Sequence, residues 1–197
     1  MASKFEDVLR NAQRKGITDQ YSKDSIDWFR KNVRKSAMSP GRLLREERDN
    51  LVGAWTNLGI GRIYFAYYQP KHRDTLPYYD KFPILIPFER YSNGFLSLNL
   101  HYLPPILRAK LLDGLYDTLN NKRFDEKTKM KISYGILKGA SNTKHFKPCV
   151  KRYLGSHFRS KFIRVPQESW TTAVFLPVES FEKAGKQKVW ADSRKMV

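Results

Sequence analysis

The segment 82–102 constrains the fold more than any other part of the chain, because two runs rich in β-forming residues flank the dipeptide Asn93-Gly94. Asparagine and glycine tolerate the positive φ angles of a type I′ turn, so the dipeptide predicts a β-hairpin with strands at 82–91 and 95–102. In the second strand three leucines alternate with serine, asparagine and histidine. That alternation predicts one buried face and one wetter face, so another element must cover the hairpin on its apolar side.

Helical patterns after the hairpin provide this cover. Pro104-Pro105 precedes the segment 106–116, in which four leucines form one helical stripe, and we expect this helix to pack on the hairpin. A second helix is predicted at 146–158, with Pro148 in its first turn, whereas residues 131–137 fit either a helix or a strand.

Two further β-rich runs, at 62–68 and 170–176, are expected to form strands, the second of them being the last element of the core. Helices and antiparallel strands of this kind predict an α+β fold. Its expected form is a small curved antiparallel sheet or partial barrel with packed helices and an α-helical N-terminal arm.

The length of 197 residues suffices for one well-buried core and is too short for two ordinary domains. Residues 1–50 carry thin amphipathic stripes and predict the helical arm, which docks on the domain or on a partner and includes a short charged third helix after Pro40. Residues 51–178 form the expected core domain. Residues 179–197 are polar and basic, and we expect a tail that orders only on a partner.

No apolar stretch approaches the roughly 20 residues of a membrane span, and the first residues show no signal-peptide pattern. We therefore expect no membrane association and synthesis in the cytoplasm. The single cysteine, Cys149, excludes an intramolecular disulfide and any metal site built from several cysteines.

The positive charge is large and unevenly distributed. Lysine and arginine number 37 against 19 acidic residues, a formal net charge of +18. Between Lys122 and Arg164 there are 13 basic residues, and the only acidic ones are Asp125 and Glu126. Such an imbalance favours the binding of a polyanion, most simply DNA.

The first candidate binding surface is the segment 144–164, where basic residues are interleaved with aromatic ones. Lysines and arginines at repeated spacing can neutralise phosphates and release counterions. The residues predicted to do so are Lys144, Lys147, Lys151, Arg152, His157, Arg159, Lys161 and Arg164. In the alternative interpretation Tyr153, Phe158 and Phe162 belong to the core and the charges only solvate a helix.

The second candidate surface is the loop 69–81, which contributes Lys71, His72, Arg73 and Lys81. Together with Tyr78 and Tyr79, these side chains could bind phosphate oxygens and sugars. The alternative is that the two tyrosines only anchor a long loop to the sheet.

No catalytic motif is recognisable, and we predict a protein that is not an enzyme and uses no metal or cofactor. The four histidines lack the close pairing of a helical metal motif, and there is no glycine-rich phosphate loop or nucleophile elbow. Asp74, Asp80 and Glu89 could in principle hold Mg²⁺ for a nuclease. Cys149 has basic neighbours but no evident base partner, so burial as a small apolar residue is expected.

Three stretches of the sequence resemble a known family. They are residues 67–83 (YYQPKHRDTLPYYDKFP), 94–113 (GFLSLNLHYLPPILRAKLLD) and 146–154 (FKPCVKRYL). They resemble small virion proteins of T4-like tailed bacteriophages and their marine relatives, in particular the DNA end protector proteins. The resemblance spans about residues 60–190 and implies a particle component that sits on the ends of packaged DNA at the head exit and blocks host exonucleases.

The preferred hypothesis is therefore a non-enzymatic virion protein, made in the host cytoplasm, that binds the ends of double-stranded DNA mainly through phosphates. A structural protein of the head-tail connector, tail or baseplate is the alternative, with the basic face set against acidic regions of other virion proteins. A nuclease acting on DNA ends is the third possibility.

Overall fold

The computed structural model describes residues 4–17, 19, 22–34, 51–175 and 178–196. Its α-helices are α1 (Lys4–Arg14), α2 (Lys23–Arg34), α4 (Pro105–Asn120), α5 (Glu126–Ser141), α6 (Trp170–Phe175) and α7 (Lys186–Lys195). Its strands are β1 (Leu51–Val52), β2 (Ile63–Phe65), β3 (Tyr79–Asp80), β4 (Ile84–Tyr91), β5 (Gly94–Asn99), β6 (Val150–Leu154), β7 (Phe162–Val165) and β8 (Phe181–Glu182). Short 3₁₀ turns include η2 (Trp55–Asn57), η3 (Leu100–Tyr102), η4 (Lys147–Cys149) and η5 (Gly155–His157).

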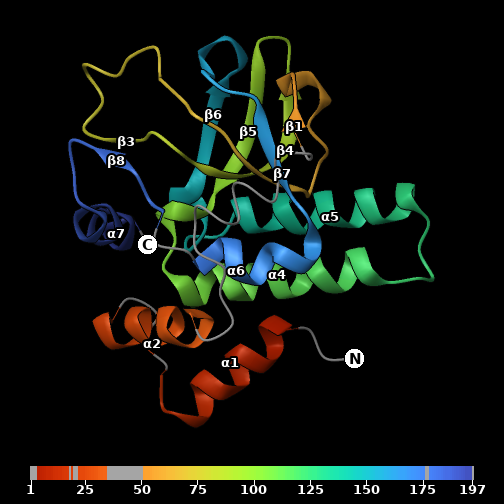
Figure 1. Ribbon diagram of the computed structural model, residues 1–197, viewed down its shortest axis with the longest axis vertical. Coiled ribbons are helices and arrows are strands. Elements are labelled where there is room, and N and C mark those ends of the chain that lie inside the picture. Colours follow the sequence, from red (N-terminus) through yellow and green to blue (C-terminus); the bar gives the residue numbers. More distant parts are fainter. Residues whose placement is uncertain (1–3, 18, 20–21, 35–50, 176–177, 197) are drawn as a thin grey trace.

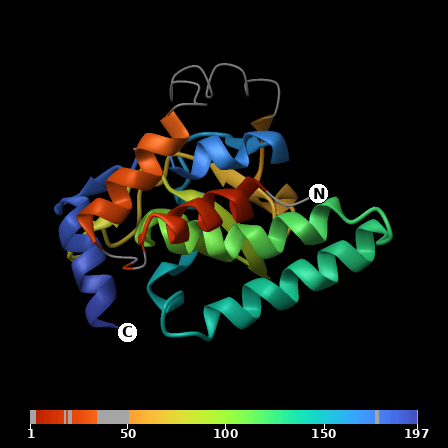
Figure 2. The same ribbon diagram turned by 90° about the horizontal axis from the view of Figure 1, so that it is seen from below.

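A six-stranded antiparallel sheet in the order β1-β7-β2-β4-β5-β6 forms the centre of the molecule, with helices packed below it (Figure 1). Figure 2 shows α1 and α4 side by side in that helical layer. The remaining strands, β3 and β8, pair in a separate two-stranded sheet. The predicted α+β fold with a curved antiparallel sheet is confirmed, and the sheet is open rather than closed into a barrel.

The predicted hairpin is confirmed as β4 and β5, with Tyr91 paired to Gly94 across the turn. The predicted type I′ turn is wrong. Its two central residues, Ser92 and Asn93, would both need a positive φ, and among the described non-glycine residues only Lys183 has one. Gly94 is required for another reason, since a Cβ there would lie 1.9 Å from the carbonyl oxygen of Tyr153 on β6.

The two faces of the sheet are both buried. The leucines of β5 and the stripe on α4 share one core with Phe65 and Phe88, so the predicted cover of the hairpin by that helix is confirmed. The opposite face, expected to be wetter, is buried as well: Ser97 and Asn99 have no exposed surface. His101, which follows the strand in η3, is also fully buried. An aromatic cluster around Phe95 covers this face, which is why its polar residues are enclosed.

Curvature brings the two edges of the sheet together at one end. Trp55 follows β1 and Gly155 follows β6, and a Cβ on Gly155 would lie 2.0 Å from the indole nitrogen of Trp55. Only glycine leaves room for this contact. The ring of Trp55 also packs against the aromatic cluster. The two edge strands, β1 and β6, are not paired with each other.

Two segments fold differently from their predictions. The helix predicted at 146–158 is η4, strand β6 and η5, because Val150–Leu154 pairs along β5 at the edge of the sheet. The strand predicted at 170–176 is α6, over the residues described there, with Trp170 buried and its indole nitrogen donating to the carbonyl oxygen of Val165 at 3.1 Å. Residues 131–137, which fit either type, lie within α5.

The N-terminal arm packs on the core. Phe5 of α1 is fully buried, with its ring 6.1 Å from that of Tyr116 and 6.2 Å from that of Phe175. The third helix expected after Pro40 lies outside the described residues.

The C-terminal segment is part of the domain, so the expectation that it orders only on a partner is wrong for residues 178–196. β8 pairs with β3, and Trp190 of α7 is buried and donates its indole hydrogen to the carbonyl oxygen of His101 at 2.7 Å. No helix in the described ranges is long and apolar enough to cross a membrane.

Candidate nucleic-acid interface

Two segments predicted to bind nucleic acid lie side by side at the end of the sheet far from α1 and α2 (Figure 1). One is the connection from β2 to β3, and the other follows β6. Tyr68 and Phe158 form an antiparallel bridge between them. The backbone nitrogen of Gln69 donates to the oxygen of His157 at 3.0 Å, and that of Arg159 donates to the oxygen of Tyr67 at 2.8 Å. These bonds fix the two segments to each other.

A polar cleft of about 370 Å³ lies between these segments. We call it the basic cleft, and its walls are Gln69, Pro70, Lys71, Arg73, Asp74, His157 and Arg159. Lys71 and Arg73 come from one segment and His157 and Arg159 from the other, so residues about ninety positions apart in the sequence meet here. His72 belongs to the same loop and is exposed, but it does not line the cleft.

Gln69 holds His157 and Arg159 of the second segment in place. The side-chain oxygen of Gln69 accepts a hydrogen bond from Nε of Arg159 at 3.1 Å. The backbone oxygen of Gln69 lies 3.0 Å from Nδ1 of His157, and because a carbonyl only accepts, the ring carries a proton on Nδ1. The remaining nitrogens of the Arg159 guanidinium stay available to a ligand in the cleft.

Asp74 is the one acidic side chain among the described walls of the cleft. Its carboxylate lies 3.7 Å from Nε of Arg73, and both side chains are largely exposed. An exposed pair of this kind is weak, because water and salt screen it. The pair therefore does not cancel the positive charge of the cleft.

The other predicted residues are distributed around the cleft rather than in it. Lys144 and Lys147 precede β6 whereas His157 follows it, so they lie toward the opposite end of that strand, and both are exposed. Lys161 and Arg164 are exposed beside and on β7. These four are not brought into the cleft.

Lys151 and Arg152 occupy neighbouring positions of β6 and do not line the basic cleft. The ammonium of Lys151 lies 4.1 Å from the ring centroid of Tyr102, and burial lowers the pKa of Lys151. The guanidinium of Arg152 lies 4.2 Å from the ring centroid of Tyr91 and donates to the backbone oxygen of Tyr153 at 3.0 Å.

Lys81, which is predicted to bind phosphate, is paired with an acidic side chain of the protein. Its ammonium lies 2.5 Å from a carboxylate oxygen of Glu182, and this partner raises the pKa of Lys81. Of the remaining basic side chains predicted to bind, only Arg73 has an ion-pair partner among the described residues. Most of the charge predicted to bind a polyanion is thus not neutralised within the described part of the chain.

The aromatic residues of the predicted surface are mainly structural. Tyr153 and Phe162 are buried in the aromatic cluster and Phe158 packs against it, which agrees with the core interpretation. The ring of Tyr78 lies 6.2 Å from that of Tyr102 and 6.5 Å from that of Phe181, so it anchors the loop to the neighbouring elements.

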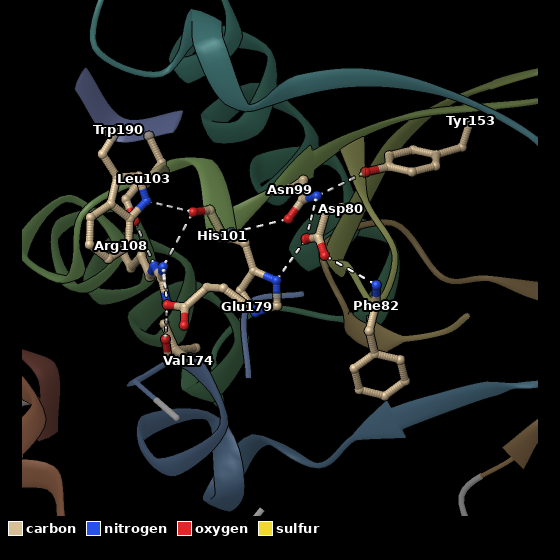
Figure 3. Close-up of polar contacts among 10 residues, drawn as sticks. All are labelled: Asp80, Phe82, Asn99, His101, Leu103, Arg108, Tyr153, Val174, Glu179 and Trp190. Carbon is tan, nitrogen blue, oxygen red and sulfur yellow. Dashed lines mark hydrogen bonds and ion pairs between the residues drawn. The ribbon is translucent and has the colours of Figure 1, made fainter. Parts of the chain in front are cut away.

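The three candidate carboxylates do not come together. Asp80 is buried, with a carboxylate oxygen 2.7 Å from Nδ1 of His101 (Figure 3). Asp74 is exposed in the loop, while Glu89 contacts Lys138 at 2.7 Å. No group of three possible metal ligands occurs within the described residues.

Cys149 is enclosed in the core. Its sulfur lies 2.9 Å from the backbone oxygen of Phe146, and burial raises the pKa of Cys149 to about 12. The thiol therefore stays protonated at neutral pH and is a poor nucleophile.

Sequence reasoning missed a buried polar network that includes Asp80, Asn99 and Arg108 (Figure 3). Asn99 donates to both Asp80 and Tyr153 at 3.0 Å, and Arg108 on α4 donates to Glu179 at 2.8 Å. The only signal was the polar residues alternating with the leucines of β5, and that alternation was taken to indicate a wetter face.

The fold and the cleft define a basic α+β domain whose surface is suited to a polyanion. The family model described as Phage T4 terminal DNA protecting protein matches residues 1–193, and the chain belongs to this family. The match includes the N-terminal arm, which the resemblance over about residues 60–190 left out. Neither the curated proteins nor the solved structures contain a match to this chain.

Proposed function

We propose that this protein binds the ends of packaged double-stranded DNA through their phosphates and shields them from exonucleases, without an enzymatic activity of its own. The observation that supports this most strongly is the meeting of Lys71, Arg73, His157 and Arg159 in one cleft. The description of the family supports a DNA end as the ligand and the phage particle as the location.

Steric exclusion is the simplest mechanism of protection. An exonuclease must take hold of the terminal nucleotides, and a protein that occupies the last phosphates denies it that position. Arg159 is held by Gln69 and loses little freedom on binding, so its contacts with phosphate oxygens are favourable. The exposed cations around the cleft would contact phosphates farther from the end.

The test is protection of a linear duplex from a processive exonuclease. The triple cleft variant Lys71→Ala, Arg73→Ala, Arg159→Ala removes three cations of the cleft. Lys31→Ala removes one exposed cation from α2, on the far side of the molecule (Figure 1), and serves as the matched control.

We expect the wild type and the control to slow digestion and the triple cleft variant to lose most of the protection. Equal digestion with and without the wild-type protein would refute the proposal. So would full protection by the triple cleft variant. The same duplex, incubated with protein and Mg²⁺ or Mn²⁺ alone, should stay intact, and cleavage there would favour the nuclease alternative.

Location in the particle separates end binding from a purely structural role. A protein bound to the DNA end should leave the virion with the genome. Retention on DNA-free tails would instead favour the alternative in which the basic face contacts other virion proteins.

A further inference from the structure

A second cavity, of about 180 Å³, lies next to the basic cleft, and Pro70 lines both of them. We call it the tyrosine–lysine pocket. The side chains that matter here are Tyr68, Tyr78, Tyr79, Tyr102, Tyr153 and Lys151. Two cations line this pocket, Lys151 and Arg152. Arg152 is exposed, whereas Lys151 is partly buried and lies against a phenol ring.

Lys151 has no anionic partner among the described residues, although it is partly buried. Its ammonium lies 4.1 Å from the ring centroid of Tyr102, which compensates only in part for the water it has lost. Burial accordingly lowers the pKa of Lys151. A bound anion would supply the missing counter-charge and stabilise the ammonium form.

Asp80 also lines the pocket, but its carboxylate is directed to other partners (Figure 3). It accepts hydrogen bonds from the backbone nitrogen of Phe82 at 3.1 Å and from Asn99 at 3.0 Å, and it lies 2.7 Å from Nδ1 of His101. Asp80 therefore does not serve as the counter-ion of Lys151, which leaves that cation for a ligand.

A hydroxyl donor completes the site. The oxygen of Tyr153 accepts a hydrogen bond from Asn99 at 3.0 Å, so its own hydrogen can be donated onward. Burial raises the pKa of Tyr153, which keeps that hydrogen in place. An ammonium and a phenol hydroxyl in a small cavity suit the oxygens of a phosphate.

We propose that the tyrosine–lysine pocket binds the phosphate monoester at the end of a DNA strand while the adjoining duplex lies over the basic cleft. The inference rests on the proposed function. A cavity of this size admits the end of a strand, whereas an internal phosphodiester continues into a sugar on both sides. A monoester also carries up to about two negative charges at neutral pH, against one for a diester.

The experiment compares duplexes closed by a hairpin loop at one end, so that each has a single free end. That end carries a 5′-phosphate, a 3′-phosphate or only hydroxyl groups. We expect the wild type to prefer one phosphorylated end over the hydroxyl end by about tenfold, the effect of one charge-assisted hydrogen bond. Comparison of the 5′-phosphorylated duplex with the 3′-phosphorylated duplex shows which strand terminus the pocket binds.

Lys151→Gln should bring this preference to within about twofold. Tyr153→Phe, which keeps the ring and removes one hydroxyl, should reduce the preference partially. Lys31→Gln is the matched control and should retain it.

The outcomes separate the pocket from the cleft. If the wild type binds the hydroxyl-ended duplex in a salt-dependent way and the triple cleft variant does not, the proposed function is supported. That result does not test the pocket. If that binding is present but the wild type shows no preference for a phosphorylated end, or Lys151→Gln keeps the preference, the pocket assignment is overturned. If no duplex is bound at all, both proposals fall.

Discussion

Replacing Arg108 by methionine is expected to lower the free energy of unfolding by about 3–5 kcal/mol, the usual cost of breaking a buried ion pair by removing one partner. Arg108 lies on α4 and is fully buried. Its guanidinium donates to the backbone oxygens of Leu103 at 2.8 Å and Val174 at 2.7 Å, and to the carboxylate of Glu179 at 2.8 Å (Figure 3).

The magnitude follows from what the substitution leaves behind. Methionine fills much of the same volume, so the cavity contribution is small. The carboxylate of Glu179, which is buried as well, loses this guanidinium, and two carbonyl oxygens lose a donor. Because Glu179 precedes β8, and β8 holds β3, the loss should also loosen the loop that forms one wall of the cleft.

Urea unfolding followed by circular dichroism measures the effect. Lys110→Met, an exposed position on the same helix, is the control and should change stability by less than about 0.5 kcal/mol. Adding Glu179→Gln to the Arg108 variant should recover part of the loss, since the carboxylate that lost the Arg108 guanidinium no longer carries a charge. A loss below about 1 kcal/mol for Arg108→Met would refute this account of how the C-terminal segment is held.

Three further predictions concern single side chains. Lys81→Ala should leave the salt dependence of DNA binding unchanged, because Glu182 already neutralises Lys81, and a clear decrease in the slope would show that Lys81 contacts phosphate. Cys149 should react with a thiol reagent at pH 8 far more slowly in the folded protein than in urea, given its burial and its pKa of about 12, and equal rates would contradict the burial. Lys138 and Tyr91 lower the pKa of Glu89 from 4.5, so this contact stabilises the fold above that pH and ceases to do so as the pH falls through the lower folded value. Glu89→Gln should therefore be less stable than the wild type at pH 7 and equally stable in strong acid, as thermal unfolding can show.

The elements that sequence reasoning predicted correctly are those with strong local signals. The hairpin of β4 and β5 combines a turn dipeptide with strict alternation, and α4 combines two prolines at its start with a leucine stripe. The prediction for β6 was wrong because Val150, Leu154 and Phe158 have a helix-like spacing. Pairing with β5, more than fifty positions earlier in the sequence, decides its conformation.

The composition of the binding surface was partly accessible from sequence, but its geometry was not. The density of cations marked both segments of the cleft. Their meeting depends on the bridge between Tyr68 and Phe158 and on the hydrogen bond from Arg159 to Gln69, contacts that no local pattern encodes. The pairing of Lys81 with Glu182 depends in the same way on β3 meeting β8.

The most direct test of whether the basic cleft binds DNA uses a duplex closed by a hairpin loop at one end. Its dissociation constant is measured across salt concentrations for the wild type and the triple cleft variant. Each phosphate contact contributes about 0.9 to the slope of log K against log salt concentration, so the loss of three contacts should reduce it by about 2.7. Lys31→Ala should keep the wild-type slope. An identical slope for the wild type and the triple cleft variant would contradict the assignment of the cleft as the DNA-binding surface.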